Sequence, residues 1–421
     1  MAILRLSDDD NDVLSGDRGT AARLCMGIMV EYGRALGAPN LISISRAHID
    51  GCLYQGKSGL EFAQRLNEGQ ASVVVDTTLN VGGVDLLHPH LNRGDRARIN
   101  EARKLMHAYT SMGCRPTWTC APYQLHGRPV FGEDVAWAES NAIAFINSVV
   151  GARSDRYGDF IDICAAITGR VPNYGLHRAE NRRGQVVFDI ADVSRAWSQI
   201  DLFWPLLGLL VGREVGSLIP VLIGLNAAPS EDDLKAFGAA AASAGSVAMF
   251  HVVGVTPEAP TLDDALQAER ALQTITVTGD MLRGAAITMT SRRTGKLTAI
   301  SLGTPHFSIS EFAELVRHIQ GRKCRPEVEF YVSTSRDILA DIEKRGWADT
   351  LRDFGAEIVV DTCTYLTPII KRRSGVVMTN SAKWAYYAPG NLGFEIVLAP
   401  LSACVRSAIS GEIKAESLPI A

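Results

Sequence analysis

The sequence predicts a multi-domain α/β protein whose parallel or mixed sheets are flanked by helices. From about residue 217, β-branched runs alternate with helical stretches, which is the rhythm of βαβ units in a parallel sheet covered on both faces. Near the N-terminus, two successive β-type runs each end in polar residues, as strands do where α/β proteins build sites. At 421 residues the chain is also too long for one compact core. We therefore expect three parts, residues 1–210, 211–325 and 326–421.

The N-terminal quarter is expected to place helices around a pair of strands. Two successive strands that both end in polar clusters predict a site at the strand ends more strongly than either strand alone. The expected helices are a first helix capped by Ser7–Asp10, then Thr20–Leu36, Ser58–Glu68 and Asp95–Met112, and the expected strands are Leu41–Ser45, followed by Arg46–Tyr54, and Ala71–Val75, followed by Asp76–Asn80.

The central stretch Gly113–Arg156 begins with Cys120 in a proline-bounded loop and is expected to continue into a helix. Glu133 and Asp134 suit a helix start and Gly151 suits its end. On a helical wheel, Ser140 and Asn147 share one line, with Asn141 and Ser148 beside it, whereas Glu139 falls on an apolar arc where a carboxylate is costly to bury. A structural hydrogen-bond network and an active site lined by Glu139, Asn141 and Cys120 both account for this pattern.

The C-terminal part reads as alternating strands and helices, after a loop at Arg170–His177 that is dense in functional side chains. The expected strands are Ile219–Leu225, Val247–Val255, Leu272–Val277, Leu297–Leu302, Val328–Val332, Ile358–Val360, Val376–Thr379 and Phe394–Leu398, and the expected helices are Ser230–Ala244, Thr261–Ala271, Ser308–Gln320 and Ser335–Arg345, with a further helix start at Asn380–Trp384.

Composition excludes several classes of protein. A net charge of -4 without a basic run argues against a nucleic-acid surface. The most apolar window, Leu202–Leu225, is interrupted by prolines and charges, so it fits buried core better than a membrane span. The acidic start lacks the apolar core of a signal peptide. Because the eight cysteines have no regular spacing, we expect a reducing compartment, the cytoplasm.

Cysteines are the most suggestive chemical feature, since the usual glycine-rich, zinc-protease and serine-hydrolase motifs are missing. Cys52, Cys120 and Cys363 each follow an expected strand or turn and have polar neighbours. On spacing alone, unconnected buried thiols are favoured over shared metal ligation.

Several segments, taken together and in order, resemble the large catalytic part of the aconitase X family, within the aconitase superfamily of iron–sulfur dehydratases. The resemblance runs from the first helix to about Pro400. Its segments are RAHIDGCLYQG (Arg46–Gly56), DTTLN (Asp76–Asn80), TWTCAPY (Thr117–Tyr123), GEDVAWAESNAIAFINSVVGAR (Gly132–Arg153), AAITGRVPNYGLH (Ala165–His177), LGTPHFS (Leu302–Ser308), and DTC (Asp361–Cys363) with Lys383 downstream.

This resemblance implies an aconitase-type large subunit with its sheets around a central cleft. Residues 1–210 would carry the cluster and substrate loops, and residues 326–421 would complete the cleft. The family implies an iron–sulfur cluster held by three cysteines, here Cys52, Cys120 and Cys363. Thr304 stands where the archaeal branch, which is similar to mevalonate 5-phosphate dehydratase, has a cysteine ligand. The exchange of Thr304 for Cys52 is similar to the bacterial branch, the cis-3-hydroxy-L-proline dehydratases with a 2Fe–2S cluster.

The resemblance also implies roles in dehydration to a pyrroline-2-carboxylate. The iron would act as Lewis acid on the hydroxyl, while the protein grips the carboxylate and stabilises developing charge. Glu139 would pair with the ring ammonium, and His48 would orient its loop or shuttle protons. The implied catalytic residues are Glu139, His48 and Lys383, and the implied substrate-binding residues are Gly51, Asn80, Asn141, Ser140, Asn147 and His177.

The family further implies a small swivelling domain that supplies a catalytic serine base, and we expect it here as a separate small subunit. Two alternatives remain open. One is the large subunit of a mevalonate 5-phosphate dehydratase, which Thr304 disfavours. The other is a cluster-free regulatory protein that binds RNA, which the acidic balance disfavours.

Overall fold

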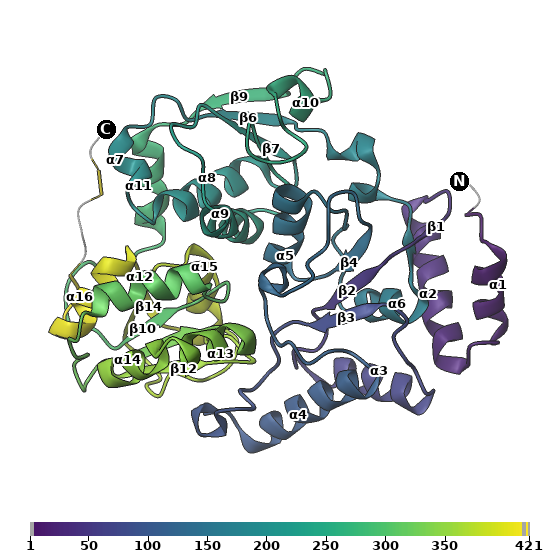
Figure 1. The fold of residues 1–421 in the computed structure, drawn as a ribbon, viewed down its shortest axis with the longest axis horizontal. Helices are drawn as coiled ribbons and strands as arrows, with labels where there is room; N and C mark the ends of the chain where they lie inside the picture. Colours follow the sequence, from purple (N-terminus) through teal and green to yellow (C-terminus); the bar gives the residue numbers. More distant parts are fainter. Residues whose placement is uncertain (1–3, 415–417, 420–421) are drawn as a thin grey trace. The chain divides into compact units, whose positions relative to one another are not determined.

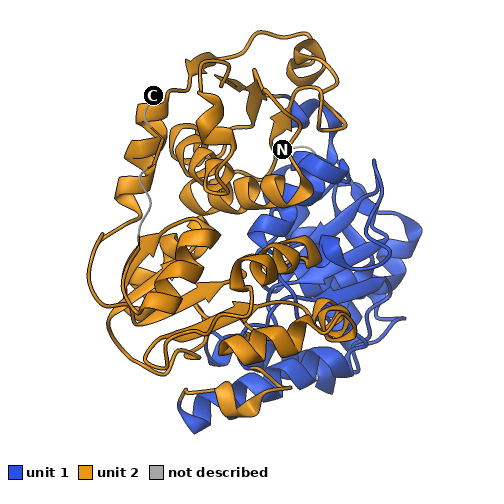
Figure 2. Ribbon diagram, turned by 60° about the vertical axis from the view of Figure 1, so that its left-hand side comes forward, with its two compact units in different colours: residues 1–84, 95–183 blue, residues 85–94, 184–421 orange. Residues whose placement is uncertain are grey.

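The computed structural model describes residues 4–414 and 418–419 and divides the chain into two compact units. Unit 1 comprises residues 1–84 and 95–183, and unit 2 comprises residues 85–94 and 184–421 (blue and orange in Figure 2). The expected boundaries after residues 210 and 325 stay a prediction.

Unit 1 is built on a short parallel sheet in which β2 lies between β3 and β4. Ala47, His48 and Ile49 of β2 are all buried, so both faces of this strand are covered. A separate antiparallel ribbon pairs β1 with β5. The elements, labelled in Figure 1, are α1 (Asp8–Ser15), α2 (Thr20–Leu36), β1 (Leu41–Ser43), β2 (Arg46–Ile49), α3 (Lys57–Glu68), β3 (Asp76–Leu79), α4 (Arg96–Ser111), the 3-10 turn η2 (Pro122–Gln124), β4 (Val135–Trp137), α5 (Ser140–Phe145), the π turn η3 (Ile146–Val150), α6 (Ile161–Thr168), β5 (Arg170–Pro172) and the 3-10 turns η4 (Gly175–His177) and η5 (Ala179–Arg182).

Two predictions in unit 1 are wrong. The expected strand Ala71–Val75 is displaced, because the ladder with β2 is formed by Asp76–Leu79. The helix expected from Glu133 onward begins only at Ser140, because Val135–Trp137 form β4 beside β2. All three residues of β4 are buried, and such a short apolar run has no period by which sequence could separate strand from helix.

Unit 2 contains two parallel sheets, with strand orders β8-β7-β6-β9 and β12-β11-β10-β13-β14. The predicted α/β class, with parallel sheets flanked by helices, is confirmed. The elements are η1 (Pro89–Leu91), β6 (Val186–Asp189), α7 (Arg195–Ser198), α8 (Phe203–Val215), β7 (Pro220–Ile223), α9 (Glu231–Ala244), β8 (His251–Val252), α10 (Leu262–Leu266), β9 (Gln273–Thr276), α11 (Gly279–Thr288), β10 (Ala299–Leu302), α12 (Ile309–Ile319), β11 (Glu329–Ser333), α13 (Arg336–Lys344), α14 (Trp347–Phe354), β12 (Ala356–Val359), β13 (Val376–Thr379), α15 (Ala382–Leu392), β14 (Glu395–Leu398) and α16 (Leu401–Ser410).

The core of the larger sheet forms between its strands and helices α12, α14 and α16. Phe312 of α12 and Leu351 of α14 belong to the same buried cluster as Ile300 and Leu302 of β10. Burial of such side chains is the main source of stability for this part of the chain.

The segment 85–94 belongs to unit 2 although the chain on both sides of it belongs to unit 1. The buried carboxylate of Asp85 accepts the N–H of Val360 at 3.0 Å and the N–H of His88 at 2.7 Å. The N–H of Leu86 donates to Asp361 at 3.1 Å. These bonds tie the segment to the chain that follows β12.

Within the described ranges, 4–414 and 418–419, none of the helices combines the length and the apolarity needed to cross a membrane.

Candidate functional site

The polar residues of unit 1 gather at one edge of its parallel sheet. Asp50, Gly51 and Cys52 follow β2, Asn80 follows β3, and Glu139 follows β4 after a single residue. Because the strands are parallel, their carboxyl ends lie at the same edge, which is where α/β folds place ligands. The fold thus brings together Gly51, Cys52, Asn80 and Glu139 from distant parts of the sequence.

The loop after β2 is held by the carboxylate of Asp162 from α6. Asp162 Oδ2 accepts the backbone N–H of Asp50 at 2.8 Å and that of Gly51 at 3.1 Å, and Asp162 is fully buried. Asn80 Nδ2 donates to Asp50 Oδ1, which links the loops after β2 and β3. Burial raises the pKa of Asp162 to about 7 and that of Asp50 to about 7. Asp162 was not predicted as a site residue, because it stands in the apolar run of α6.

Cys52 is fully buried beneath this loop. Its thiol donates to the carbonyl oxygens of Asn80 at 3.3 Å and of Ile49 at 3.4 Å. Burial raises the pKa of the Cys52 thiol well above its usual value. A ligand role for Cys52 stays a prediction.

Glu139 is the N-cap of α5, which explains how this carboxylate is buried. It accepts the backbone N–H of Ala142 at 2.8 Å and also a hydrogen bond from Asn141 Nδ2. The expectation that Glu139 lies on an apolar helical arc is wrong, because the residues before it form β4. The positive end of the α5 dipole and these donors stabilise the charge instead.

Asn141 connects the start of α5 to the Cys120 loop. Its Nδ2 also donates to the carbonyl oxygen of Cys120 at 3.0 Å, and its Oδ1 accepts from the hydroxyl of Tyr123 at 2.7 Å. Cys120 is 4% exposed, in the loop between Thr119 and Pro122. This network places the Cys120 loop beside Glu139 within unit 1.

Farther along the same helix, Asn147 makes a second and separate network. Its Oδ1 accepts from the N–H of Ser154 and from Arg182, each at 3.0 Å, and its Nδ2 donates to the carbonyl oxygen of Ser154 at 2.8 Å. The π turn that begins at Ile146 widens the helix, so the wheel that aligned Ser140 with Asn147 does not hold across it. Substrate binding by Ser140 and Asn147 stays a prediction.

The two predicted histidines of unit 1 are buried in hydrogen-bonded positions. His48 Nδ1 lies 2.8 Å from Thr78 Oγ1, and burial lowers the pKa of His48 to about 3, so the imidazole is neutral. His177 Nδ1 lies 2.7 Å from Asp134 Oδ1, and its other nitrogen contacts the Tyr157 hydroxyl. The roles expected for His48 and His177 stay predictions.

In unit 2 the candidate cluster and catalytic residues lie at the carboxyl edge of the larger sheet. Gly303–His306 follow β10, Asp361–Cys363 follow β12, and Lys383 lies in the first turn of α15 after β13. Gly303 has a positive φ of 85°, and a Cβ atom there would lie 2.1 Å from the carbonyl oxygen of Ser333. Only glycine therefore permits the turn that leads into Thr304, Pro305 and His306.

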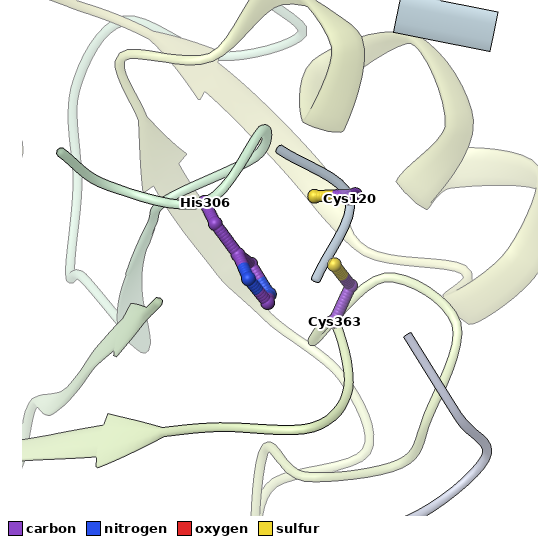
Figure 3. Close-up of side chains that lie close together, drawn as sticks. All are labelled: Cys120, His306 and Cys363. Atoms are coloured by element: carbon purple, nitrogen blue, oxygen red, sulfur yellow. The ribbon is translucent and has the colours of Figure 1, made fainter. Parts of the chain in front are cut away.

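His306 and Cys363 approach each other at this edge (Figure 3). A ring nitrogen of His306 and Sγ of Cys363 lie within 4.8 Å, and both residues are buried. His306 Nε2 lies 3.4 Å from the carbonyl oxygen of Thr362, and burial lowers the pKa of His306 to about 4. A neutral imidazole beside a thiol is a pair of metal-binding groups. Cys120, also labelled in Figure 3, belongs to unit 1.

His306 was missed as a candidate ligand, although its segment was part of the resemblance. A lone histidine after a proline has no spacing partner in sequence. The available signal was its position: it follows an expected strand, as Cys363 does.

The Cys363 loop is held rigidly by its own neighbours. Asp361 accepts two hydrogen bonds from Arg336, at 2.6 and 2.7 Å. The carbonyl oxygen of Cys363 accepts the N–H of Leu366 at 3.1 Å and of Thr367 at 3.0 Å. Such bidentate, charge-assisted contacts fix the position of the thiol.

Models of the aconitase X first, second and third domains match residues 3–180, 184–286 and 297–410. Cis-3-hydroxy-L-proline dehydratase from Pseudomonas aeruginosa is 43% identical over 97% of this chain and 70% of that protein. The protein of the same name from Hypocrea jecorina is 42% identical over 97% of this chain and 69% of its own length.

Archaeal proteins match over nearly their whole length. The phosphomevalonate dehydratase large subunit of Methanosarcina mazei is 33% identical over 97% of this chain and 98% of that protein. The crystal structure of Thermococcus kodakaraensis aconitase X in its holo-form superposes with a TM-score of 0.85 at 30% identity, covering 96% of this chain and 100% of that one. The multi-domain aconitase-type fold is thereby confirmed, and the chain belongs to the aconitase X family.

Proposed function

We propose that this chain is the large catalytic part of an iron–sulfur hydro-lyase that dehydrates cis-3-hydroxy-L-proline to a pyrroline-2-carboxylate. The observation that carries the proposal is the pattern of identities. The chain is 42–43% identical to cis-3-hydroxy-L-proline dehydratases and 30–34% identical to phosphomevalonate dehydratase large subunits.

The proposed cluster ligands are Cys52, Cys120 and Cys363, with a 2Fe–2S cluster. The donor types fit, because iron–sulfur clusters are held by thiolates and, in some centres, by imidazole. Because His306 lies close to Cys363, we propose that His306 either binds the cluster as a further ligand or lies next to it. When bound, the cluster would supply a Lewis acid for the departing hydroxyl.

In this reaction the base takes the proton from Cα, the bond between C3 and the hydroxyl oxygen breaks, and water leaves. The enamine that results becomes the imine by moving one proton from nitrogen to carbon. Glu139, His48 and Lys383 are the proposed catalytic residues, and Glu139 also orients Asn141 through their hydrogen bond. Gly51, Asn80 and Asn141 are proposed to hold the substrate, because they stand at the sheet edge of unit 1.

We also propose a separate small subunit that supplies the serine base. The support is that five archaeal relatives, of which this chain covers 96–99%, are named large subunits. The hydroxyproline dehydratases are matched over 69–70% of their length. We place the protein in the cytoplasm, since every cysteine is a free thiol.

The test is to co-express the chain with small-subunit candidates, purify the protein anaerobically, and assay cis-3-hydroxy-L-proline and mevalonate 5-phosphate side by side. We expect iron, visible absorbance, and turnover of the hydroxyproline alone. Turnover of the phosphate ester alone would assign the other activity of the family, and a colourless, iron-free protein would contradict the cluster.

A further inference from the structure

Unit 2 contains a cavity of about 310 Å³ at the carboxyl edge of its larger sheet. Its lining includes Gly303–Pro305, Asn380–Lys383 and residues of α9 and α12. The volume is in the range of small-molecule sites. We call this space the α9–α12–α15 cavity.

One wall of the cavity is positive. Ser381 caps α15, whose first turn contains no acidic residue, so the positive end of the helix dipole is uncompensated by its own carboxylates. Lys383, which is 3% exposed, adds a cation at the same place. A helix start with a buried lysine favours a carboxylate ligand.

Another part of the lining is acidic. Asp232 and Asp233 lie in the first turn of α9, and Glu311 and Glu314 lie on α12. The buried amine of Lys235 contacts Asp232 at 2.9 Å and also Glu311, so its single charge compensates one of two carboxylates. Arg317 lines the cavity as well but is exposed, so solvent screens its charge.

A buried hydroxyl on the cavity lining provides an independent indication of a ligand. Thr304 is 4% exposed, and within the described part of the chain its Oγ1 has no hydrogen-bond partner. Leaving a buried hydroxyl unsatisfied costs free energy, and native proteins normally provide a partner. A ligand carboxylate in the cavity would be that partner.

We propose that the α9–α12–α15 cavity binds the zwitterionic amino acid, with its carboxylate at Lys383 and Thr304 and its ring ammonium facing Glu314 and Asp233. This deepens the proposed function and rests on it, and it assigns the charged groups of the substrate to unit 2 rather than to Gly51, Asn80 and Asn141 of unit 1. Glu139 is then not needed as the partner of the ring nitrogen, which agrees with its use as the α5 cap. The carboxylates of the lining disfavour a phosphate monoester, because a dianion would lie near them.

The first experiment measures binding of L-proline by calorimetry, because L-proline carries both charges but has no hydroxyl to lose. The chain of 421 residues, with any small subunit that co-purifies, is compared with its Thr304→Val and Thr304→Ser variants. We expect Thr304→Val to weaken binding about tenfold, as for loss of one hydrogen bond to a charged group, and Thr304→Ser to retain it. Unchanged binding in Thr304→Val would overturn the assignment of Thr304.

The second experiment changes the charge of the acidic part of the lining. Glu314→Lys should weaken L-proline binding and create measurable binding of inorganic phosphate, whereas Glu231→Gln on the exposed start of α9, outside the lining, should change neither. Ala236→Phe should fill the cavity and abolish binding of L-proline, and Ala236→Ser should preserve it. Tighter binding of phosphate than of L-proline by the unmodified protein would overturn the proposal.

The cavity assignment and the proposed reaction can be tested separately. If cis-3-hydroxy-L-proline is dehydrated but these variants leave its KM and the binding of L-proline unchanged, the cavity assignment is wrong and the function stands. If L-proline binds and the variants weaken it while no dehydration occurs, the cavity assignment stands and the reaction is wrong.

Discussion

The hydroxyl of Tyr109 lies 2.9 Å from the position that a Cβ atom would take at Gly51. Tyr109 is fully buried, and its hydroxyl has no hydrogen-bond partner among the described residues. The loop that carries Asp50, Gly51 and Cys52 is thus confined between this ring and the Asp162 carboxylate.

Gly51→Ala should therefore destabilise the protein by about 1–3 kcal/mol, the usual cost of overpacking. Tyr109→Phe removes the contacting oxygen, so we expect the double variant to recover most of the loss. Tyr109→Phe alone should be neutral or stabilising, because it removes a buried unsatisfied group. Thermal unfolding of the four proteins measures this cycle, and equal losses in the single Gly51→Ala variant and the double variant would contradict it.

Asp162 should make stability fall as pH rises. Burial raises its pKa from the usual value near 4 to about 7, so the folded protein binds the extra proton between these values. Its contribution is thus present below about pH 4 and is lost progressively up to about pH 7. Asp162→Asn cannot ionise and should remove that part of the slope.

The measurement is the midpoint of thermal unfolding at pH 5 and pH 8, for the original chain and for Asp162→Asn. Asp8→Asn, an exposed change in the first turn of α1, serves as control and should leave the slope unchanged. A slope that is identical in all three proteins would show that Asp162 is charged in the folded state throughout.

Loss of a cluster ligand should be visible without any assay of turnover. Cys120→Ala and Cys363→Ala are expected to abolish bound iron and visible absorbance, and also activity, while circular dichroism stays unchanged. Cys404→Ala is the matched control in unit 2, because Cys404 is equally buried and its thiol donates to a backbone carbonyl of Ala399. Cys52→Ala tests the third ligand. Full iron content in Cys52→Ala, together with loss in His306→Ala, would assign the third position to His306.

Lys235 should be critical for the stability of unit 2. Its side chain is 2% exposed, and it contacts two carboxylates and, at 3.5 Å, the carbonyl oxygen of His306. Lys235→Met leaves those carboxylates without their cation and should cost about 3–5 kcal/mol. Adding Glu311→Gln should restore part of the loss, since it removes one of the uncompensated charges. Denaturant unfolding of the single and double variants checks this, and additive losses would argue against the pairing.

The residues at the carboxyl ends of strands could be predicted from sequence because their logic is local. Asp50–Cys52, Asn80 and Asp361–Cys363 follow β2, β3 and β12, and in each unit these residues lie at one sheet edge. The strand before Asn80 was nevertheless expected too early, at Ala71–Val75, because β3 itself (Asp76–Leu79) is largely polar. The start of α5 could not be predicted, because β4 is three buried residues long and has no visible period. The π turn at Ile146 then displaced the face on which Asn147 lies.

The buried charged and titratable residues could not be predicted from sequence either. Lys235 follows Glu231, Asp232 and Asp233, a run that resembles an exposed helix face in sequence. Its burial depends on the approach of α12, whose Glu311 contacts it. Asp162 and His306 are likewise recognised through partners far away in the chain, and a single sequence contains no signal for such pairs.

Because residues 85–94 belong to unit 2, the two units cannot be separated by a single cut in the chain. A fragment comprising 184–421 would lack Asp85, the acceptor for Val360, and Leu86, the donor to Asp361. A fragment that begins at residue 184 therefore loses two hydrogen bonds that hold the chain just before Cys363. A fragment that represents unit 2 must also include residues 85–94. Comparing the iron affinity of this fragment with that of residues 184–421 alone would measure what the ten residues contribute.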